Sequence, residues 1–590
     1  MMKVWIILSL LLASGLPATA AVIREPYLQM VTPTSVTIVW QTDIGSANNS
    51  RVQYGTVAGN LNQTAFGSAV IPPSNLSVKN HVVMITGLSS ATTYFYNVGT
   101  VTNGVQGGGT PNHFFMTAPT VGTTTPFRAW ILGDSGDGPG DGDQEAVRDA
   151  MLAETALNPP SPDIILHAGD IAYADGTDTQ FTTNHFAIYQ NILRHTPLWP
   201  TLGNHEARNS SSASGLGPYY EAHVLPTGGE AGGAPSGTEA YYSFDYANAH
   251  FIVLDSMDSN RAPGSPMLTW LQADLSGTAQ EWVIVLFHHP PYTKGSHDSD
   301  SAADSGGRLT EMRENVLPIL EAGGVDLVLG GHSHIYERSY PLLGAYGYGS
   351  SPDFVTPNKS TLVSKRNILD TGDGKPSGGG AYTTGTVYVV AGHGGRSVSS
   401  AFGGNHPVMF FSEAQFGSVL LDINGSNLTV QNVRSDQSIS DTFTITKNSL
   451  ANANIVWRNT GMGAVAAWHL NGLDLAGSNV LGTVSNDWAI VGLGDLDGNA
   501  KTDLVWRNTS TGAVSGWLMN GLTLTNSQVI ATVGNLDWTI KGVGDLDGDG
   551  KADLVWRNTS TGAVTGWLMN GLTLSSFGVI ATVATDWEIQ

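Results

Sequence analysis

The 590-residue chain contains no cysteine. This excludes disulfide bonds, zinc sites built on thiolates and cysteine nucleophiles. Secreted eukaryotic enzymes of this size usually carry disulfides, so the absence favours a bacterial source. A chain of 590 residues is too long for one hydrophobic core, and we therefore expect three or four domains.

Charged residues are scarce, at 13% of the chain, and their balance is acidic, with a formal net charge of -23. A chain with this charge is a poor candidate for electrostatic binding of nucleic acid. The excess carboxylates suit solubility and, at particular positions, cation binding. Beyond the first 20 residues no uncharged apolar run is long enough to cross a bilayer, so the sequence predicts no transmembrane segment.

Residues 1–20, MMKVWIILSLLLASGLPATA, combine a lysine, an apolar stretch and an end of small residues. This order is typical of a secretory signal peptide, here cleaved after Ala20. The apolar stretch is too short to span a bilayer comfortably. We therefore expect a secreted, soluble protein, either extracellular or periplasmic.

Residues 21–120 are expected to form an all-β sandwich. The segment SVTIVWQT alternates apolar and polar residues, and HVVMITGL and TTYFYNVGT follow with turn residues between them. The stretch GLSSATTYFYNV resembles the tyrosine-bearing corner of fibronectin type III sandwiches.

Residues 125–447 show a different pattern, after the linker-like stretch APTVGTTTP. Short apolar runs alternate with stretches of helical spacing, such as GDQEAVRDAMLAETAL and RLTEMRENVLPILEAG. This alternation indicates an α/β domain with buried strands. Residues 340–385 are rich in glycine and serine, and we expect a long loop there.

Five apolar runs of this domain end in side chains that can bind a metal. In an open α/β sheet, ligands bind beyond the carboxyl ends of the strands, so we expect these side chains to lie together. Carboxylate, amide oxygen and imidazole suit Fe, Mn or Zn, and two adjacent ions can clamp a phosphate ester and activate a water. The runs FRAWILGD, DIILHAGD, LWPTLGNH, WVIVLFHH and VDLVLGGHSH supply Asp134, Asp170, Asn204, His288, and His332 with His334.

The ordered blocks GDSG, GDIAY, GNHE, VLFH and GHSHIYERS resemble those of the purple acid phosphatases, which are binuclear metallophosphoesterases. The resemblance covers roughly residues 24–445 and includes the preceding sandwich. It implies a catalytic domain with a β-sandwich core flanked by helices. It also implies an Fe(III) site formed by Asp134, Asp170, Tyr173 and His334, and a divalent site (Zn, Mn or Fe) formed by Asp170 as bridge with Asn204, His288 and His332.

Tyr173 is the discriminating ligand, because a phenolate stabilises Fe(III) and gives the family its purple colour. His205 and His297 match the family's outer pair, which binds phosphate oxygens and helps to protonate the leaving alcohol. His289 and His393 are expected to be structural.

The activity that the resemblance implies is acid phosphatase, which hydrolyses small-molecule phosphate monoesters by in-line attack of a metal-activated hydroxide. Two alternatives remain open. One is a phosphodiesterase or nucleotide-hydrolysing enzyme that uses the same site. The other is a calcium-dependent surface or matrix-binding protein with a passive phosphatase domain.

Residues 449–590 repeat themselves. The stretch LVWRNTSTGAVSGWLMNGLTL recurs almost unchanged as LVWRNTSTGAVTGWLMNGLTL, after a diverged copy, and Trp457, Trp506 and Trp556 lie 49 and 50 residues apart. This period predicts stacked, all-β propeller-like blades. A closed propeller has about 4–8 blades. This chain has about two and a half repeats up to TDWEIQ, so a small domain, completion by another chain and a fragment all remain open.

Two repeats are preceded by acidic turns, GDLDGNAKTDLVW and GDLDGDGKADLVW. Oxygen ligands at alternate positions around a glycine suit Ca²⁺. The turns resemble those of FG-GAP/VCBS blades, and such repeats could tether an enzyme to glycan or matrix. The first copy, TKNSLANAN, lacks the carboxylates. The candidate calcium ligands are Asp495, Asp497, Asn499, Asp503, Asp545, Asp547, Asp549 and Asp553.

Overall fold

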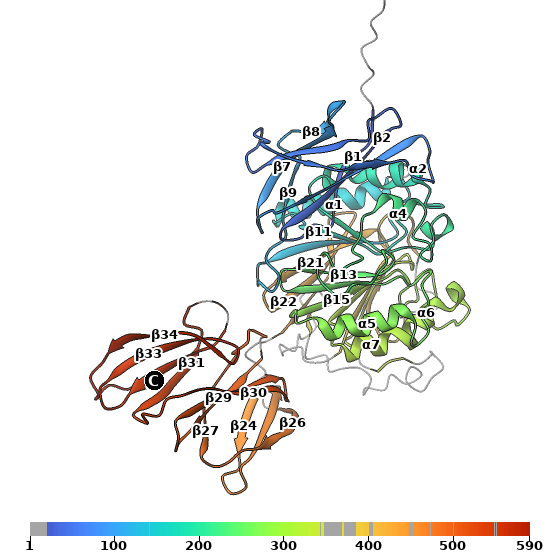
Figure 1. The fold of residues 1–590 in the computed structure, drawn as a ribbon. Helices are drawn as coiled ribbons and strands as arrows, with labels where there is room; N and C mark the ends of the chain where they lie inside the picture. The colour runs from blue at the N-terminus through green and yellow to red at the C-terminus, as the bar shows by residue number, and fades with distance from the viewer. Residues whose placement is uncertain are drawn as a thin grey trace, which may run out of the picture. The chain divides into compact units, whose positions relative to one another are not determined.

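The computed structural model describes residues 21–589 except 141, 343, 347–367, 371–384, 400–404, 448–453, 472–473, 500, 548 and 550. The predicted signal peptide, most of the loop at 340–385 and most of TKNSLANAN lie outside the described residues. The chain folds as two compact units that divide near residue 445 (Figure 1). Among the described helices, none is long and apolar enough to cross a membrane.

The first unit begins with the expected β-sandwich. Trp40 is buried and stacks on His81, with ring centroids 4.7 Å apart. The Tyr94 hydroxyl accepts the N–H of Ser89 at 3.1 Å, which is the corner contact that the sequence predicted. One sheet has the order β1 (Val22–Gln29), β2 (Ser35–Asp43), β6 (Val78–Thr86) and β5 (Ser68–Val70). The other has the order β4 (Gln63–Phe66), β3 (Ser50–Gly55), β7 (Thr93–Thr100) and β8 (Gly104–Gly108), and β9 (Phe114–Met116) pairs with β7.

Two larger sheets follow in the same unit and pack face to face. Trp199 stacks on Phe244 across them, with ring centroids 3.9 Å apart, and Phe127 lies 6.2 Å from Phe251. The first sheet has the order β12 (Leu198–Pro200), β11 (Ile164–His167), β10 (Phe127–Leu132), β21 (Gly417–Asn424), β22 (Asn427–Arg434), β23 (Ile439–Thr446) and β18 (Ile368–Asp370). The second has the order β13 (Tyr242–Tyr246), β14 (Ala249–Val253), β15 (Trp282–Leu286), β16 (Leu327–Gly330), β19 (Val387–Ala391), β17 (Tyr336–Ser339) and β20 (Met409–Glu413).

Helices flank these sheets, so the predicted β-sandwich core flanked by helices is confirmed (Figure 1). The two stretches with helical spacing form α1 and the continuous run α6–η4–α7. Apolar side chains of α5 and α7 pack on the second sheet. The helices are α1 (Asp143–Leu157), α2 (Asp178–Gln180), η1 (Phe181–Phe186), α3 (Ala187–Leu193), η2 (Glu206–Arg208), α4 (Pro218–Ala222), α5 (Pro266–Gly277), η3 (Asp304–Gly307), α6 (Arg308–Glu311), η4 (Met312–Val316) and α7 (Leu317–Ala322).

The expectation that five strand ends share the edge of one open sheet needs a correction. Strands β10, β11 and β12 belong to the first sheet, whereas β15 and β16 belong to the second. The reason is the antiparallel pair β13–β14, which begins a new sheet between the third and fourth runs. The ligand-bearing strand ends therefore come from two facing sheets.

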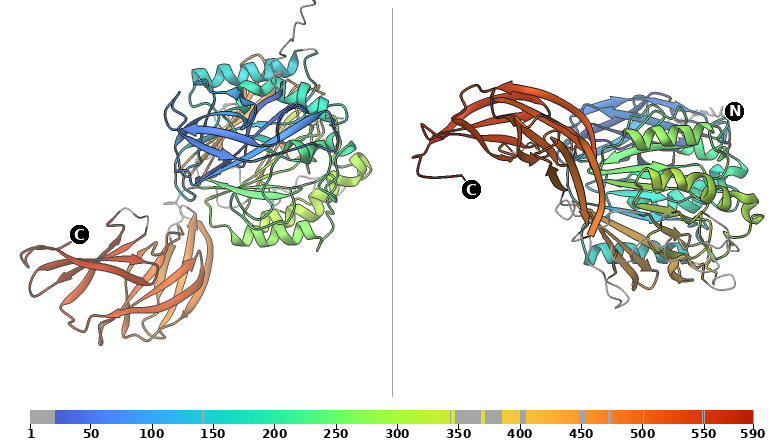
Figure 2. Two further views of the ribbon diagram at one scale, coloured as in Figure 1. Left: turned by 45° about the horizontal axis from the view of Figure 1, so that its top comes forward. Right: turned by 90° about the horizontal axis from the view of Figure 1, so that it is seen from below.

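The second unit contains three β-sheets side by side, which we call the first, second and third blades (Figure 2). Trp506 and Trp556 are buried in the cores between them. The first blade is β24 (Asn454–Arg458), β25 (Ala464–Asn471) and β26 (Asp474–Thr483). The second is β27 (Trp488–Gly494), β28 (Asp503–Asn508), β29 (Ala513–Asn520) and β30 (Thr523–Thr532). The third is β31 (Trp538–Gly544), β32 (Asp553–Asn558), β33 (Ala563–Asn570) and β34 (Thr573–Thr582).

Buried histidines make the first unit sensitive to acid. Burial lowers the pKa of His81 to about 4 and that of His223 to about 3, and it lowers the pKa of His185 well below its ordinary value. In the unfolded chain a histidine titrates near pH 6.5. The unfolded state therefore binds more protons as the pH falls from about 6.5 toward these values, and the folded state loses stability over that window.

We expect the variant His223→Gln to flatten this pH dependence. His223 costs the folded state about 2 kcal/mol between pH 7 and pH 5, because only the unfolded chain takes up its proton. The measurement is the free energy of urea unfolding of the variant and the parent at both pH values. Equal slopes for the two proteins would contradict the prediction.

Candidate metal centre

The predicted ligands lie directly after their strands. Asp134 follows β10, Asp170 follows β11 and His332 follows β16, and these three have φ angles of 55°, 53° and 64°. Residues other than glycine rarely adopt positive φ, and such strained positions cluster at functional sites. The backbone turns sharply at each strand end and directs the side chains into one region between the two sheets.

One group of side chains surrounds the Tyr173 hydroxyl. That oxygen lies 3.1 Å from Asp134 Oδ1, 2.9 Å from Asp170 Oδ2 and 3.2 Å from His334 Nε2. The phenol is buried, and its single proton cannot serve all three neighbours. Two carboxylates, a phenol and an imidazole together form a donor set that suits a hard to intermediate cation.

A second group surrounds the Asn204 side chain. Its Oδ1 atom lies 2.9 Å from His288 Nε2 and 2.8 Å from His332 Nδ1. Asp170 Oδ1 lies 3.5 Å from His288 Nε2, while Asp170 Oδ2 reaches Tyr173, so this carboxylate faces both groups. The structure thus brings together all seven side chains that the sequence predicted as ligands.

Backbone and hydroxyl contacts orient the imidazoles. His288 Nδ1 donates to the Ala168 carbonyl at 2.7 Å, which leaves Nε2 as an acceptor toward the site. His334 Nδ1 lies 2.6 Å from Ser397 Oγ. Fixing one ring nitrogen sets the tautomer and aims the other nitrogen at a metal.

The carboxylates of the first group favour a positive charge at this place. Burial, together with the Asp134 and Asp170 carboxylates, raises the pKa of Tyr173 well above its ordinary value. Burial opposes the charged form of His334, but the Asp134 carboxylate raises the pKa of that imidazole nonetheless. A bound cation would instead lower the pKa of Tyr173, since it stabilises the phenolate.

Glycines at the strand ends make room for the carboxylates. A Cβ atom on Gly203 would lie 2.2 Å from Asp170 Oδ1. One on Gly331 would lie 2.6 Å from Asp134 Oδ2, and one on Gly392 3.0 Å from the same oxygen. Any larger residue at these positions would displace a proposed ligand.

The two predicted outer histidines also lie at the site. His205 is held by a contact between its Nδ1 and the Ala174 carbonyl at 2.5 Å, and its Nε2 lies 3.8 Å from Asp170 Oδ2. His297 stacks on His332, with ring centroids 3.9 Å apart, and its Nδ1 contacts Asp304 Oδ1 at 2.8 Å. Both rings are partly exposed, so each can reach a substrate.

Sequence reasoning missed Glu206, the residue after the NH pair in GNHE. Its buried carboxylate accepts the N–H groups of Asp170, Ile171, Ala172 and Gly203 at 2.8–3.0 Å. Burial and the nearby Asp170 raise the pKa of Glu206 above its usual range. Glu206 ties the loops after β11 and β12 together, and only its place in the GNHE block could have indicated this.

The two histidines expected to be structural are buried and bonded. His289 Nδ1 lies 2.9 Å from Ser256 Oγ, and His393 Nε2 lies 2.8 Å from Asn432 Oδ1. His289 also lies close enough to His288 and His332 to share an ion with them.

The acidic turns of the repeats gather carboxylates as predicted, with one exception. Potential ligand atoms of Asp495, Asp497 and Asp503 lie within 4.8 Å of one another, and so do those of Asp545, Asp547 and Asp549. Asn499 Oδ1 accepts the N–H of Lys501 at 2.8 Å. Asp553 is outside the second group, and its carboxylate oxygens accept the N–H groups of Leu546 and Met569, both at 2.8 Å.

Three family descriptions match the chain. Residues 24–117 match the N-terminal domain of purple acid phosphatases, residues 127–336 match the calcineurin-like phosphoesterases, and residues 495–556 match an FG-GAP-like repeat. The second match contains the predicted ligands from Asp134 to His334. The chain is a purple acid phosphatase-like metallophosphoesterase.

Individual relatives of this metallophosphoesterase agree with that result. Purple acid phosphatase 22 of Arabidopsis thaliana is 30% identical over 305 residues, which cover 49% of this chain and 61% of the plant protein. An uncharacterized Mycobacterium tuberculosis protein is 27% identical over 395 residues, which cover 62% and 67%. The chain spans 52% of the Glycine max purple acid phosphatase that it matches.

A solved structure shares the fold of this metallophosphoesterase. The purple acid phosphatase PPD1 from yellow lupin seeds aligns with a TM-score of 0.54 over 72% of this chain and 74% of that one. Its sequence is 21% identical, so the likeness concerns the fold alone.

Proposed function

We propose that the chain is a secreted acid phosphatase that hydrolyses phosphate monoesters at a binuclear metal centre. The observation that carries the proposal is the convergence of seven oxygen and nitrogen donors from two sheets, with the Tyr173 phenol between two carboxylates. We assign Fe(III) to Asp134, Asp170, Tyr173 and His334. A divalent ion (Zn, Mn or Fe) is assigned to Asp170, Asn204, His288 and His332.

The residues present fit this pair of ions. Oxygen donors and imidazoles lie within hydrogen-bond distance of one another, and they carry too few protons for each to be hydrogen-bonded. When bound, two such ions supply a water of lowered pKa and positive charge for the phosphoryl oxygens. His205 and His297, fixed through their Nδ1 atoms, hold phosphate oxygens. One of them gives a proton to the leaving alcohol.

Two other functions compete with this proposal. A phosphodiesterase would use the same donors on a different ester, and comparing p-nitrophenyl phosphate with bis-p-nitrophenyl phosphate as substrates separates the two. We expect the monoester to give the higher kcat/KM. A passive domain in a calcium-dependent surface protein would show no turnover of either ester, whatever metal is supplied.

The purified protein should be purple and contain about two metal ions per chain, one of them iron. The phenolate-to-iron charge transfer gives the colour, so Tyr173→Phe should lose the visible band while far-UV circular dichroism stays unchanged. Tyr242→Phe is the matched control, because this buried hydroxyl instead donates to the Pro200 carbonyl at 2.8 Å. A colourless, iron-free parent protein would contradict the assignment of Fe(III), but it would not contradict the proposal that the protein is a hydrolase.

We further propose that the acidic turns of the repeats bind Ca²⁺. Calcium at about 100 times its Kd should stabilise the second unit by about 2.7 kcal/mol, because only the folded turn binds it. The measurement is the unfolding transition of that unit with Ca²⁺ and with chelator. Asp495→Asn/Asp497→Asn should lessen the shift, whereas Asp537→Asn, in an exposed turn of the same unit, should keep it.

A further inference from the structure

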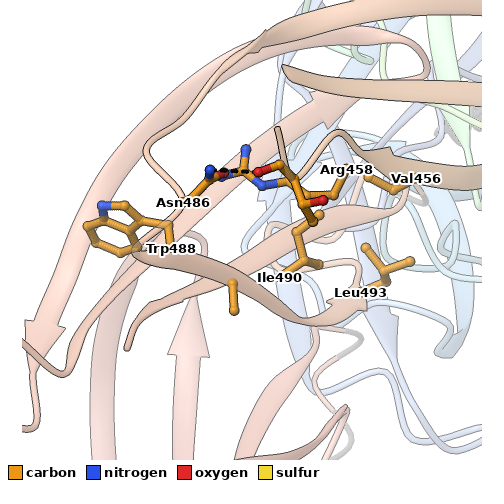
Figure 3. Close-up of a pocket in the computed structure, with 8 residues that line it drawn as sticks. Val456, Arg458, Asn486, Trp488, Ile490 and Leu493 are labelled. Carbon is orange, nitrogen blue, oxygen red and sulfur yellow. Dashed lines mark hydrogen bonds between the residues drawn. The ribbon is translucent and has the colours of Figure 1, made fainter. Parts of the chain in front are cut away.

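A cavity of about 580 Å³ lies between the first and second blades (Figure 3). Two of its polar side chains are engaged by the blades themselves. The Arg458 guanidinium donates to three backbone carbonyls at 2.6–2.8 Å, and the Asn486 amide donates to the Thr460 carbonyl at 2.7 Å. These hydrogen bonds fix the turns of the repeat, so we assign no ligand to this cavity.

A polar cluster that bears on the metal centre lies in the first unit, beneath residues 293–299, which we call the His297 loop. The two ends of this loop are joined. Thr293 N–H donates to Ser299 Oγ at 2.9 Å, and Ser299 N–H donates to the Thr293 carbonyl at 3.2 Å. The Lys294 ammonium also lies 2.5 Å from Asp298 Oδ1 within the loop. A shift at Thr293 would therefore be carried through the loop to His297.

The His297 loop packs closely on the segment between β16 and β17, which carries two of the proposed ligands. The His334 N–H donates to Ser296 Oγ at 3.0 Å, and the His297 ring stacks on the His332 ring with centroids 3.9 Å apart. Gly295 leaves no room for a side chain, because a Cβ there would lie 2.5 Å from two side chains of that segment. The place of His297 relative to the ligands is thus set where the loop rests on this segment.

The Thr293 hydroxyl ties the loop to that segment. It is buried, lies 2.7 Å from Ser333 Oγ and accepts the Gly295 N–H at 3.2 Å. It also contacts the carboxylate of Glu337, a fully buried residue of β17. The other oxygen of this carboxylate accepts the Lys294 N–H at 3.3 Å. Since Ser333 separates the two histidine ligands of the segment, one hydroxyl links the loop, the ligands and β17.

The Thr293 hydroxyl has one proton, which cannot be donated to both Ser333 and Glu337. Burial raises the pKa of Glu337 to about 7, so below that pH the group is mostly a neutral acid. Its O–H then donates to Thr293 Oγ1, whose own proton goes to Ser333 Oγ, and each donor has an acceptor. Glu337→Gln preserves these bonds, because the amide N–H₂ group takes the place of the acid O–H.

We propose that Thr293 and Glu337 are positioning residues that hold His297 over the metal centre. This rests on the proposed function, in which His297 holds phosphate oxygens. The His297 ring is partly exposed, so its place depends on the backbone that carries it. Misplacing a catalytic group by about 1 Å can lower the rate about 10²-fold.

The test is Thr293→Val, which keeps the shape of the side chain and removes the hydroxyl. We expect kcat/KM for p-nitrophenyl phosphate to fall about 10²-fold, with unchanged circular dichroism and metal content. Thr293→Ser should recover most of the loss, because it restores the hydroxyl. Thr155→Val is the matched control and should keep parental activity, since this buried hydroxyl of α1 donates to the Met151 carbonyl at 3.0 Å.

Combining this variant with His297→Asn shows whether Thr293 acts through that histidine. Thr293→Val/His297→Asn should be no slower than His297→Asn alone, because the place of the loop no longer matters once the imidazole is gone. The two single variants should also shift the ratio of rates for p-nitrophenyl phosphate and ethyl phosphate in the same direction. Ethoxide needs a proton in order to leave far more than nitrophenolate does.

Glu337 is tested by two substitutions in an assay at pH 5. Glu337→Gln should keep most of the parental activity, whereas Glu337→Leu should lose about as much as Thr293→Val.

Losses that add in the double variant, or parental activity in Thr293→Val, would overturn the proposal. So would loss of metal from Thr293→Val, since the hydroxyl would then support the ligands and not His297. A parent protein that hydrolyses neither ester would overturn the proposed function itself, and this inference with it.

Discussion

Replacing Asp170 with asparagine should lower kcat/KM for p-nitrophenyl phosphate by at least about 10³-fold, since loss of even one preorganised electrostatic group costs about 10²–10³-fold. The Asp170 carboxylate faces both donor groups, through Oδ1 toward His288 and Oδ2 toward Tyr173. An asparagine offers one neutral oxygen and turns an N–H₂ group toward the other side. We therefore expect the variant to lose metal as well as activity. Metal analysis of the purified variant measures the loss of metal.

The matched control lies at the other end of the same strand. Asp163 precedes β11, is half-buried and accepts the N–H of Arg128 at 2.9 Å. Burial raises the pKa of Asp163 to about 6, so an amide there changes little charge when both proteins are assayed at pH 5, where this carboxyl is mostly protonated. Asp163→Asn should retain activity and metal. If the Asp170→Asn protein kept the parental kcat/KM and its full metal content, the proposed bridging role of Asp170 would be wrong.

Six of the seven proposed ligands were predictable because they follow apolar runs at strand ends, where the chain must turn, whereas Tyr173 was assigned only through the resemblance to the purple acid phosphatases. Asp134 and Asp170 follow strands of one sheet, and His288 and His332 follow strands of the other. Strand spacing alone predicted their convergence, but not that two facing sheets supply them. That division depends on which strands pair, and β10 pairs with β21, nearly 300 residues along the chain.

Contacts between distant segments explain the rest of what sequence could not show. Glu206 gathers four N–H groups from two loops, and nothing in its local spacing distinguishes it from a surface glutamate. The tail YERS after the ligand pair His332 and His334 carried no interpretable pattern either. In the structure its residues form β17, an inner strand of the second large sheet.

The YERS segment connects the metal centre to the core through buried charges. Glu337 accepts the Thr293 hydroxyl and the Lys294 N–H, at the start of the loop that carries His297. On the other side, the Arg338 guanidinium donates to both oxygens of Asp441 at 2.7 Å. The residues of that pair are 103 positions apart, so no local motif could have revealed it.

Breaking the Arg338–Asp441 pair should destabilise the first unit by about 3–5 kcal/mol, the usual cost of leaving one buried charge without its partner. Both side chains are 2% exposed, and the guanidinium lies 4.2 Å from the Phe410 ring and 4.8 Å from the Phe443 ring. Arg338→Met keeps much of the apolar contact but leaves the Asp441 carboxylate in a low dielectric. The free energy of urea unfolding of the first unit measures the loss.

A second substitution separates the charge from the packing. Asp441→Asn removes the stranded carboxylate and can still accept the Tyr336 hydroxyl, which lies 2.8 Å from it. Arg338→Met/Asp441→Asn should therefore recover part of the stability that Arg338→Met loses. The solvent-exposed pair Arg208–Asp175 is the control, because its side chains are 50% and 49% exposed and Arg208→Met should cost no more than about 1 kcal/mol. If Arg338→Met cost no more than this control, the buried pair would not be what anchors β17 beside the two histidines.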